Sequence, residues 1–321
     1  MVSQFPHAFS FECTTCGKCC NSPPALSLRE LFRYRDVFIG AIAISRAPRM
    51  RAGQRVRIGP YETLLSDEDA SACDALARLH TFPIGAHGDF ISVTTQAIDY
   101  ASPGRCPALA DDGLCRLHAD GKPDQCIAVP LDPLVPDRLQ HVVLAQRSFG
   151  EGWLGAQCIE PGERRDPALV ANGGIVANDA KAAMDRRRRA LATEREWCGR
   201  TIVDALLCDF AADPRRALAQ VPENGYRTIS LVPALLVIGG MSPALAQHCI
   251  GYIDAQTGLI RRSITRAIER RRLDDRPMTQ TLRAFLDALA RAREHLASVP
   301  AQSNASSLAE QAETYFLGHG C

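Results

Sequence analysis

The sequence has no long hydrophobic run and no excess of one charge. Its most apolar stretch, Ile229 to Gly240, is interrupted by Pro233 and is far shorter than the roughly 20 residues that a membrane-spanning helix needs. We therefore expect a core segment there and no membrane insertion. With Lys+Arg 37 against Asp+Glu 36, the formal net charge is +1, so no global field attracts nucleic acid or anionic membranes. Such a partner would need a local patch.

Several enzyme signatures are also missing. The chain has no Gly-x-Gly-x-x-Gly after a strand, no Gly-Lys-Ser/Thr phosphate loop, no Gly-x-Ser-x-Gly and no His-Glu-x-x-His. The Cys-x-x-x-Cys-x-x-Cys spacing of radical S-adenosylmethionine enzymes is absent, because the first cysteine gap here has two residues. The first twelve residues lack the basic start and apolar core of a secretory signal. We therefore expect a cytoplasmic protein, whose cysteines stay as thiols.

The composition is that of a globular protein of 321 residues, 46% hydrophobic and 23% charged, which is enough for two domains. Nine of its 13 cysteines lie between Cys13 and Cys158. We predict an α+β fold with two domains. Residues 1–165 would form an irregular, metal-stapled cysteine-cluster domain, and residues 166–321 a mainly helical domain with a flexible C-terminal tail.

Local patterns predict individual elements within these domains. Short β-like runs occur between turn residues, and N-cap residues precede several segments with helical periodicity. The predicted strands are 54–58, 89–95 and 140–146, and the predicted helices are 27–38, 67–80, a long helix from Asn178 or Asp179 to about Asp213, two helices that start at Ser242-Pro243 and Thr279, and a short helix at 308–316.

The strongest signal is a cluster of four thiols within eight residues, Cys13, Cys16, Cys19 and Cys20. A Cys-x-x-Cys turn lets two sulfurs converge on one metal ion, and two such turns overlap here. The adjacent Cys19 and Cys20 cannot both turn easily toward one tetrahedral ion. The motif therefore points to a site with more than one metal ion.

Further thiols are available on turns rich in glycine, proline and aspartate, a composition typical of loops that wrap metals. Three of them lie within residues 105–126, and a fourth follows Gly155-Ala156-Gln157. The predicted additional ligands are Cys106, Cys115, Cys126 and Cys158.

These motifs resemble the CxxCxxCC cysteine-cluster family of zinc- or iron-chelating proteins. The likeness covers about residues 11–158 and includes Cys106-Pro107-Ala108-Leu109, Asp112-Gly113-Leu114-Cys115 and Lys122-Pro123-Asp124-Gln125-Cys126, with lysine where the family has arginine. It implies bound iron or zinc, commonly as an iron–sulfur protein. It also implies a distant likeness to flagellin lysine N-methylases, and hence S-adenosylmethionine as a conceivable cofactor.

Thiol chemistry leaves the metal open. Eight thiolates suit cysteine-ligated iron–sulfur clusters, which we favour, or two Cys₄ zinc ions. A cluster could transfer electrons, as in oxidoreductases, or either metal could staple an interaction module. The helical half would meet a small-molecule or protein substrate that the sequence does not identify. The arginine runs 186–189 and 270–272 have acidic residues nearby, which favours solvated, ion-paired helix faces over nucleic-acid binding.

Overall fold

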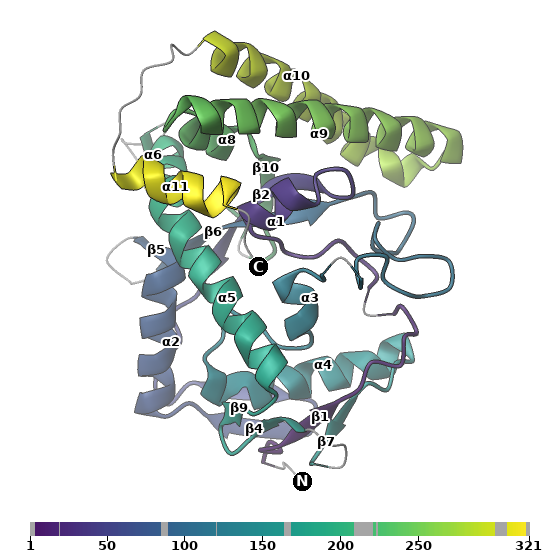
Figure 1. Cartoon of the computed structure of the whole chain (residues 1–321). Helices are drawn as coiled ribbons and strands as arrows, with labels where there is room; N and C mark the ends of the chain where they lie inside the picture. The colour runs from purple at the N-terminus through teal and green to yellow at the C-terminus, as the bar shows by residue number, and fades with distance from the viewer. Residues whose placement is uncertain are drawn as a thin grey trace. The chain divides into compact units, whose positions relative to one another are not determined.

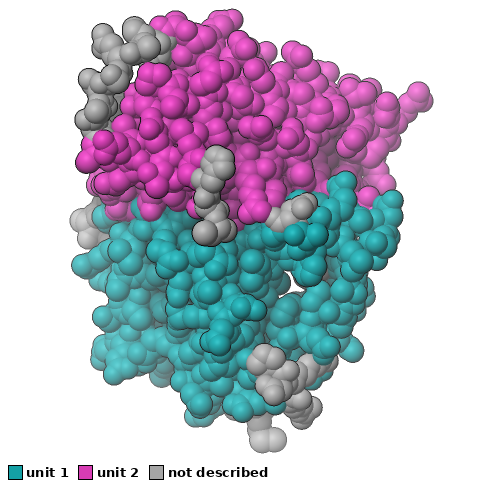
Figure 2. Space-filling view, viewed as in Figure 1, with its two compact units in different colours: residues 1–21, 46–92, 108–192 teal, residues 22–45, 93–107, 193–321 magenta. Residues whose placement is uncertain are grey.

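The chain is a mixture of helices and short antiparallel strands that forms two compact units (Figures 1 and 2). The computed structural model describes residues 4–18, 20–84, 89–119, 121–163, 168–208, 221–222, 224–298 and 307–318. Unit 1 consists of residues 1–21, 46–92 and 108–192, and unit 2 of residues 22–45, 93–107 and 193–321. Each unit is assembled from separate stretches, so this division differs from the predicted ranges 1–165 and 166–321.

Unit 1 holds most of the cysteine motif. Its strands are β1 (Phe9–Phe11), β3 (Arg55–Ile58), β4 (Tyr61–Leu64), β5 (Thr81–Ile84), β7 (Ile159–Pro161), β8 (Ala168–Ala171) and β9 (Gly174–Ile175). Its helices are α2 (Asp67–His80), α3 (Asp124–Ala128), the short η1 (Asp137–Leu139), α4 (Gln140–Leu154) and α5 (Asn178–Glu194), whose last residues enter unit 2.

A four-stranded sheet in the order β7-β1-β8-β9 forms the core of unit 1. Strand β1 lies between β7 and β8 and is antiparallel to both. Its Phe9 is 1% exposed and packs in one apolar cluster with Leu144 of α4, Val170 of β8 and Met184 of α5. Burial of these side chains fixes the sheet against the helices.

Helix α4 corrects one prediction, because residues 140–146 form the start of a helix and not a strand. The β-branched pair Val142-Val143 suggested the strand. In the fold, Leu144 and Ala145 are buried in the unit 1 core. Tertiary packing of this helix face therefore outweighs the local strand propensity. Gly155 ends the helix in the left-handed conformation at φ 66°.

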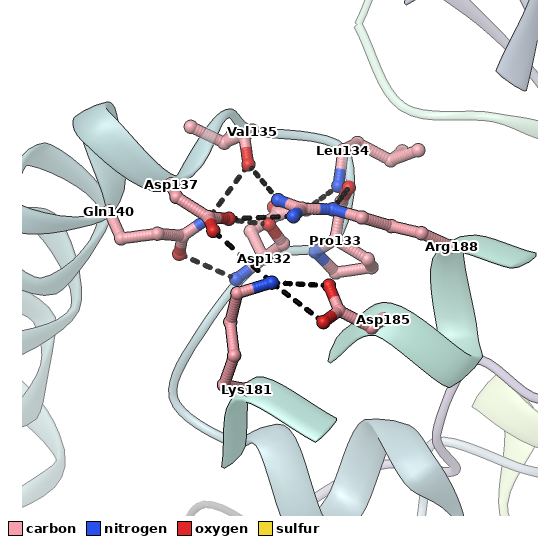
Figure 3. Close-up of polar contacts among 9 residues, drawn as sticks. All are labelled: Asp132, Pro133, Leu134, Val135, Asp137, Gln140, Lys181, Asp185 and Arg188. Atoms are coloured by element: carbon pink, nitrogen blue, oxygen red, sulfur yellow. Dashed lines mark hydrogen bonds and ion pairs between the residues drawn. The ribbon is translucent and has the colours of Figure 1, made fainter. Parts of the chain in front are cut away.

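Side chains of α4 and α5 hold the loop of residues 132–137, which precedes α4 (Figure 3). The Gln140 amide donates to the carbonyls of Asp132 and Val135 at 2.7 and 2.8 Å. From α5, Arg188 donates to the Asp137 carboxylate at 2.6 Å and to the Val135 carbonyl at 2.7 Å. Lys181 bonds Asp185 one turn along the same helix. The Arg188 bonds tie α5 to the loop that precedes α4.

Unit 2 is mainly helical. Its strands are β2 (Ile39–Ala47), β10 (Arg227–Ser230) and the second part of β6 (Asp89–Ile98). Its helices are α1 (Leu28–Arg33), the π-helical turn η2 (Arg195–Gly199), α6 (Arg200–Cys208), α8 (Val232–Gly239), α9 (Pro243–Arg270), the short η3 (Leu273–Asp275), α10 (Arg276–Ser298) and α11 (Ser307–Leu317).

In unit 2, β2 lies between β10 and β6. Strand β10 runs antiparallel to β2, with Arg227 opposite Ile44. Strand β6 begins in unit 1, where Asp89 to Ser92 pair with β5. The side chain of Gln256 on α9 is 2% exposed, accepts the N–H of Gly40 at 2.9 Å and donates to the carbonyl of Phe38 at 2.9 Å. These bonds fix α9 to the start of β2.

Several predicted helix starts are confirmed. Ser66 and Ser242 cap α2 and α9 by accepting backbone N–H groups. The long helix predicted from Asn178 is continuous to Cys208 only through the π-helical turn η2. Its expected end near Asp213 lies outside the described residues. Helix α10 begins at Arg276, three residues before the predicted start, and the predicted helix at 308–316 is α11.

The predicted core segment 229–240 is confirmed where α8 buries Ala234, Leu235 and Ile238. Over the described ranges, no helix combines the length and the apolar composition needed to cross a membrane. The fold class is thus confirmed as mixed α and β with a helical C-terminal region.

Candidate metal centre

The antiparallel pair β1–β7 brings the two ends of the cysteine-rich region together. Phe11 lies opposite Ile159 in this ladder. The next backbone N–H, that of Glu12, donates to the carbonyl of Cys158 at 3.0 Å. The chain that enters the cysteine motif at Cys13 therefore begins beside Cys158, although the two residues are far apart in sequence.

Two side chains continue this contact beyond the strands. The Thr14 hydroxyl lies 3.4 Å from the sulfur of Cys158, which is 2% exposed. Lys18 donates from Nζ to the carbonyl of Gly155 at 2.6 Å. The Cys158 N–H donates to the Glu151 carboxylate at 3.1 Å, which orients its backbone. The motif loop is thus anchored at both ends to residues 155–158.

A second loop that carries a predicted ligand forms a tight hairpin. Leu109 and Cys115 form an isolated antiparallel bridge, and the Ala110 N–H donates to the Leu114 carbonyl at 2.9 Å. The turn is closed by Asp112, whose carboxylate accepts the Leu114 N–H at 2.9 Å. This geometry holds Cys115 at the end of a short, ordered hairpin.

The hairpin packs directly on the motif loop. A Cβ atom on Gly113 would lie 2.9 Å from the carbonyl oxygen of Thr15, and one on Gly17 would lie 3.0 Å from a methyl carbon of Leu109. Both glycines have positive φ, 82° and 68°, which other residues rarely adopt. The close approach of the two loops therefore depends on glycine at both positions.

The predicted ligands differ in exposure and in location. Cys13 and Cys16 are exposed, Cys20, Cys115 and Cys126 are half-buried, and Cys106 and Cys158 are buried. Cys126 lies on α3, and Cys106 belongs to unit 2 whereas the other described members belong to unit 1. Cys19 lies outside the described residues.

The donor chemistry fits a thiophilic metal, but the described thiols are not arranged as a coordination site. The loops that carry Cys13, Cys16, Cys115 and Cys158 meet in unit 1. Among the described residues, which leave out Cys19, no three His, Cys, Asp or Glu side chains are grouped closely enough to hold a metal ion. Binding of a structural metal is coupled to folding, because the unfolded chain rarely holds the ligands in place.

The described cysteines that were not predicted as ligands lie on helical segments, Cys73 on α2, Cys198 in η2 and Cys249 on α9. Cys198 and Cys249 are buried in unit 2, and burial raises both thiol pKa values, that of Cys249 to about 12. Cys73 on α2 is only half-buried, and burial raises its pKa as well. The Cys208 side chain and Cys321 lie outside the described residues. High pKa values disfavour the thiolate form that metals bind.

Sequence reasoning missed the polar groups around Cys158. Thr14 and Lys18 lie within the motif, but neither a threonine nor a lysine at such a spacing has a recognised signature. Glu151 is seven residues from Cys158 and belongs to no recognised sequence motif. The contacts of Thr14 and Lys18 depend on long-range pairing of β1 with β7, which strands of only three residues do not reveal in the sequence.

Comparison of the chain with protein-family models, curated proteins and solved structures gives no match. The resemblance to the cysteine-cluster family therefore stays a prediction.

Proposed function

We propose that the chain is an iron-binding protein that holds an iron–sulfur cluster with thiols of unit 1. The observation that carries this proposal is the packing of the Cys13–Cys20 loop against both the Cys115 hairpin and the Cys158 segment. Three thiol-bearing segments from distant parts of the sequence meet at one place. Free thiols in a core have no need for such convergence.

Iron–sulfur is favoured over zinc for two reasons. The run Cys13-x-x-Cys16-x-x-Cys19 repeats the start of a bacterial ferredoxin ligand run. The Thr14 hydroxyl beside the Cys158 sulfur is also the kind of neighbour that tunes cluster potential. When bound, a cluster would supply one-electron redox chemistry. Zinc in the same thiols would instead make the chain a stapled interaction module.

The first experiment is anaerobic purification of the full chain, with iron, zinc and acid-labile sulfide measured beside the visible absorption spectrum. Brown protein with iron and sulfide in similar amounts supports the proposal. Colourless protein with zinc would overturn the iron assignment and favour the interaction module. Iron without sulfide would overturn the cluster, and protein without metal would overturn metal binding altogether.

A pair of variants tests which thiols are involved. Cys16→Ser should remove most of the bound iron, because it deletes a central ligand of the motif. Cys73→Ser is the matched control, since it deletes a thiol of the same unit on α2. Unchanged folding by circular dichroism confirms that metal loss is local. Equal iron loss in both variants would contradict the ligand assignment.

The lysine N-methylase alternative rests on the resemblance alone. Titration of the purified, metal-loaded chain with S-adenosylmethionine by calorimetry tests it directly. Saturable binding would support the methylase alternative. Absence of heat at millimolar ligand would remove it and leave the metal proposal unaffected.

A further inference from the structure

The two arginine runs of the sequence have different surroundings in the fold. On α5, Arg186 and Arg188 each bond a carboxylate, at 2.7 and 2.6 Å, as expected, whereas Arg187 is buried and not solvated. In the run 270–272, Arg270 pairs with Asp275 at 3.0 Å, and no carboxylate among the described residues lies within ion-pair distance of Arg271 or Arg272. The second run therefore leaves cationic charge unneutralised.

We call this turn and the helix ends beside it the α9–α10 tip, residues 262–276 (Figure 1). All of this segment is described. Within it, five arginines are exposed and have no carboxylate within ion-pair distance among the described residues, against two exposed acidic residues, Glu269 and Asp274. The five are Arg262, Arg266, Arg271, Arg272 and Arg276.

Two aliphatic side chains are exposed at the same place. Ile268 is 57% exposed and Leu273 is 68% exposed, the highest value among the exposed large hydrophobic residues. Leu273 follows Arg271 and Arg272 directly in the turn, and Ile268 lies on the last turn of α9. Exposed aliphatic side chains that lie together and are rimmed by polar residues are typical of surfaces that contact a protein or a membrane.

Buried contacts of Asp275 and Arg270 hold the backbone of the tip. Arg271 ends α9 in the left-handed conformation at φ 56°. The Asp275 carboxylate, 3% exposed, accepts from Ser102 at 3.0 Å and from Arg270 at 3.0 Å. The Arg270 guanidinium also lies 5.0 Å from the ring centre of Tyr100. The buried partners fix the turn while its outer side chains stay exposed.

We propose that the α9–α10 tip binds the surface of a bilayer that contains anionic phospholipids. Arginines beside a bilayer bind headgroup phosphates, and aliphatic side chains between them enter the boundary with the acyl chains. Single-stranded nucleic acid would favour aromatic side chains for stacking, and residues 262–276 contain none. Protein hot spots combine arginine with tryptophan and tyrosine, which residues 262–276 lack, and leucine is under-represented in them. The combination of arginine with Ile268 and Leu273 therefore favours lipid.

The test is co-sedimentation of the full chain with vesicles of phosphatidylcholine, with and without phosphatidylserine. Binding is expected only with phosphatidylserine and should weaken as salt rises. Arg271→Gln with Arg272→Gln should weaken it about thirty-fold, since each arginine near the surface contributes about 1 kcal/mol. Leu273→Ser should weaken it several-fold without changing the charge.

The matched control is Arg283→Gln with Arg291→Gln. It removes two exposed arginines from the part of α10 that lies outside the tip. This control should keep nearly full binding. If it weakens binding as much as the tip variant, general charge and not the tip is responsible, and the proposal is overturned. Absence of binding to phosphatidylserine vesicles, or tighter binding to a single-stranded RNA oligomer, would overturn it as well.

Discussion

The hydroxyl of Thr14 lies 3.4 Å from the sulfur of Cys158, across 144 residues of sequence. A sulfur that binds metal is a thiolate and can only accept, so the hydroxyl would then donate to it. This contact joins the start of the motif loop to the most buried of the described unit 1 thiols.

The first prediction concerns this hydroxyl. Thr14→Val keeps the shape of the side chain but removes the donor, so iron content should stay unchanged. The cluster potential should become more negative, because a hydrogen bond to sulfur stabilises the reduced, more negatively charged form. Thr15→Val is the control, since the Thr15 hydroxyl donates to the Thr14 carbonyl at 2.7 Å and not to sulfur. An equal shift of potential in both variants would contradict a direct role for Thr14.

The second prediction concerns the packing of the hairpin on the motif loop. Gly113→Ala should lower bound metal and thermal stability, because its Cβ would lie 2.9 Å from the Thr15 carbonyl oxygen. Gly53→Ala is the matched control, since Gly53 has φ 74° in the same unit and no atom within 4 Å of a built Cβ. Both variants pay about 1–2 kcal/mol for the left-handed conformation. Only Gly113→Ala should lose metal, as measured per folded chain.

The third prediction concerns a buried carboxylate in unit 2. Glu194 is 7% exposed and accepts from the Leu28 N–H at 2.5 Å and from the Tyr315 hydroxyl at 3.2 Å. Glu194→Ala should lower the free energy of unfolding by about 3 kcal/mol, because the Leu28 N–H loses its charged acceptor. Tyr315→Phe removes the hydroxyl that donates to Glu194 and should cost about 1 kcal/mol. Urea unfolding measures both, and equal losses would refute a central role for Glu194.

The fourth prediction is a pH dependence. Burial, with a smaller effect of Arg35, lowers the pKa of His248, whose ring stacks on Phe32 with centres 4.7 Å apart. The unfolded chain therefore binds a proton more readily than the folded one. The contribution to stability is fully present above the unfolded pKa of about 6.5, and is lost as pH falls from there through the lower folded value.

His248→Phe should reduce this loss of stability in acid, because it keeps the stacked ring and removes the titrating group. Its Nε2 is buried and has no hydrogen-bond partner among the described residues, so the variant should also be more stable at pH 7 by about 1 kcal/mol. Burial also lowers the pKa values of His80 and His141, so some acid sensitivity should remain. Thermal unfolding at pH 7 and pH 5 measures the difference. Parallel losses in variant and wild type would show that His248 does not contribute.

Local signals predicted the elements whose ends depend on neighbouring residues. Ser66 and Ser242 cap helices through bonds to residues three positions away, and these starts are visible in the sequence. Residues 140–146 were misassigned because a buried helix face and a strand share the same apolar side chains. Only the packing of Leu144 in the unit 1 core decides between them.

The candidate site was predictable in composition but not in arrangement. The spacing of Cys13, Cys16 and Cys20 is local and visible. The contact with Cys158 requires β1 to pair with β7, and a three-residue strand has no alternating pattern long enough to reveal its partner. The metal itself stays a prediction until it is measured.

The pairing of β2 with β10 limits the order in which parts of the chain can fold during synthesis. Strand β2 leaves the ribosome early, but Arg227 to Ser230, which pair with it, are made only after the whole of unit 1. Unit 1 likewise waits for Met184 of α5 to complete its core. We therefore expect that nascent chains released before α5 do not bind metal. During most of translation, the N-terminal cysteines would therefore be solvent-exposed thiols without bound metal.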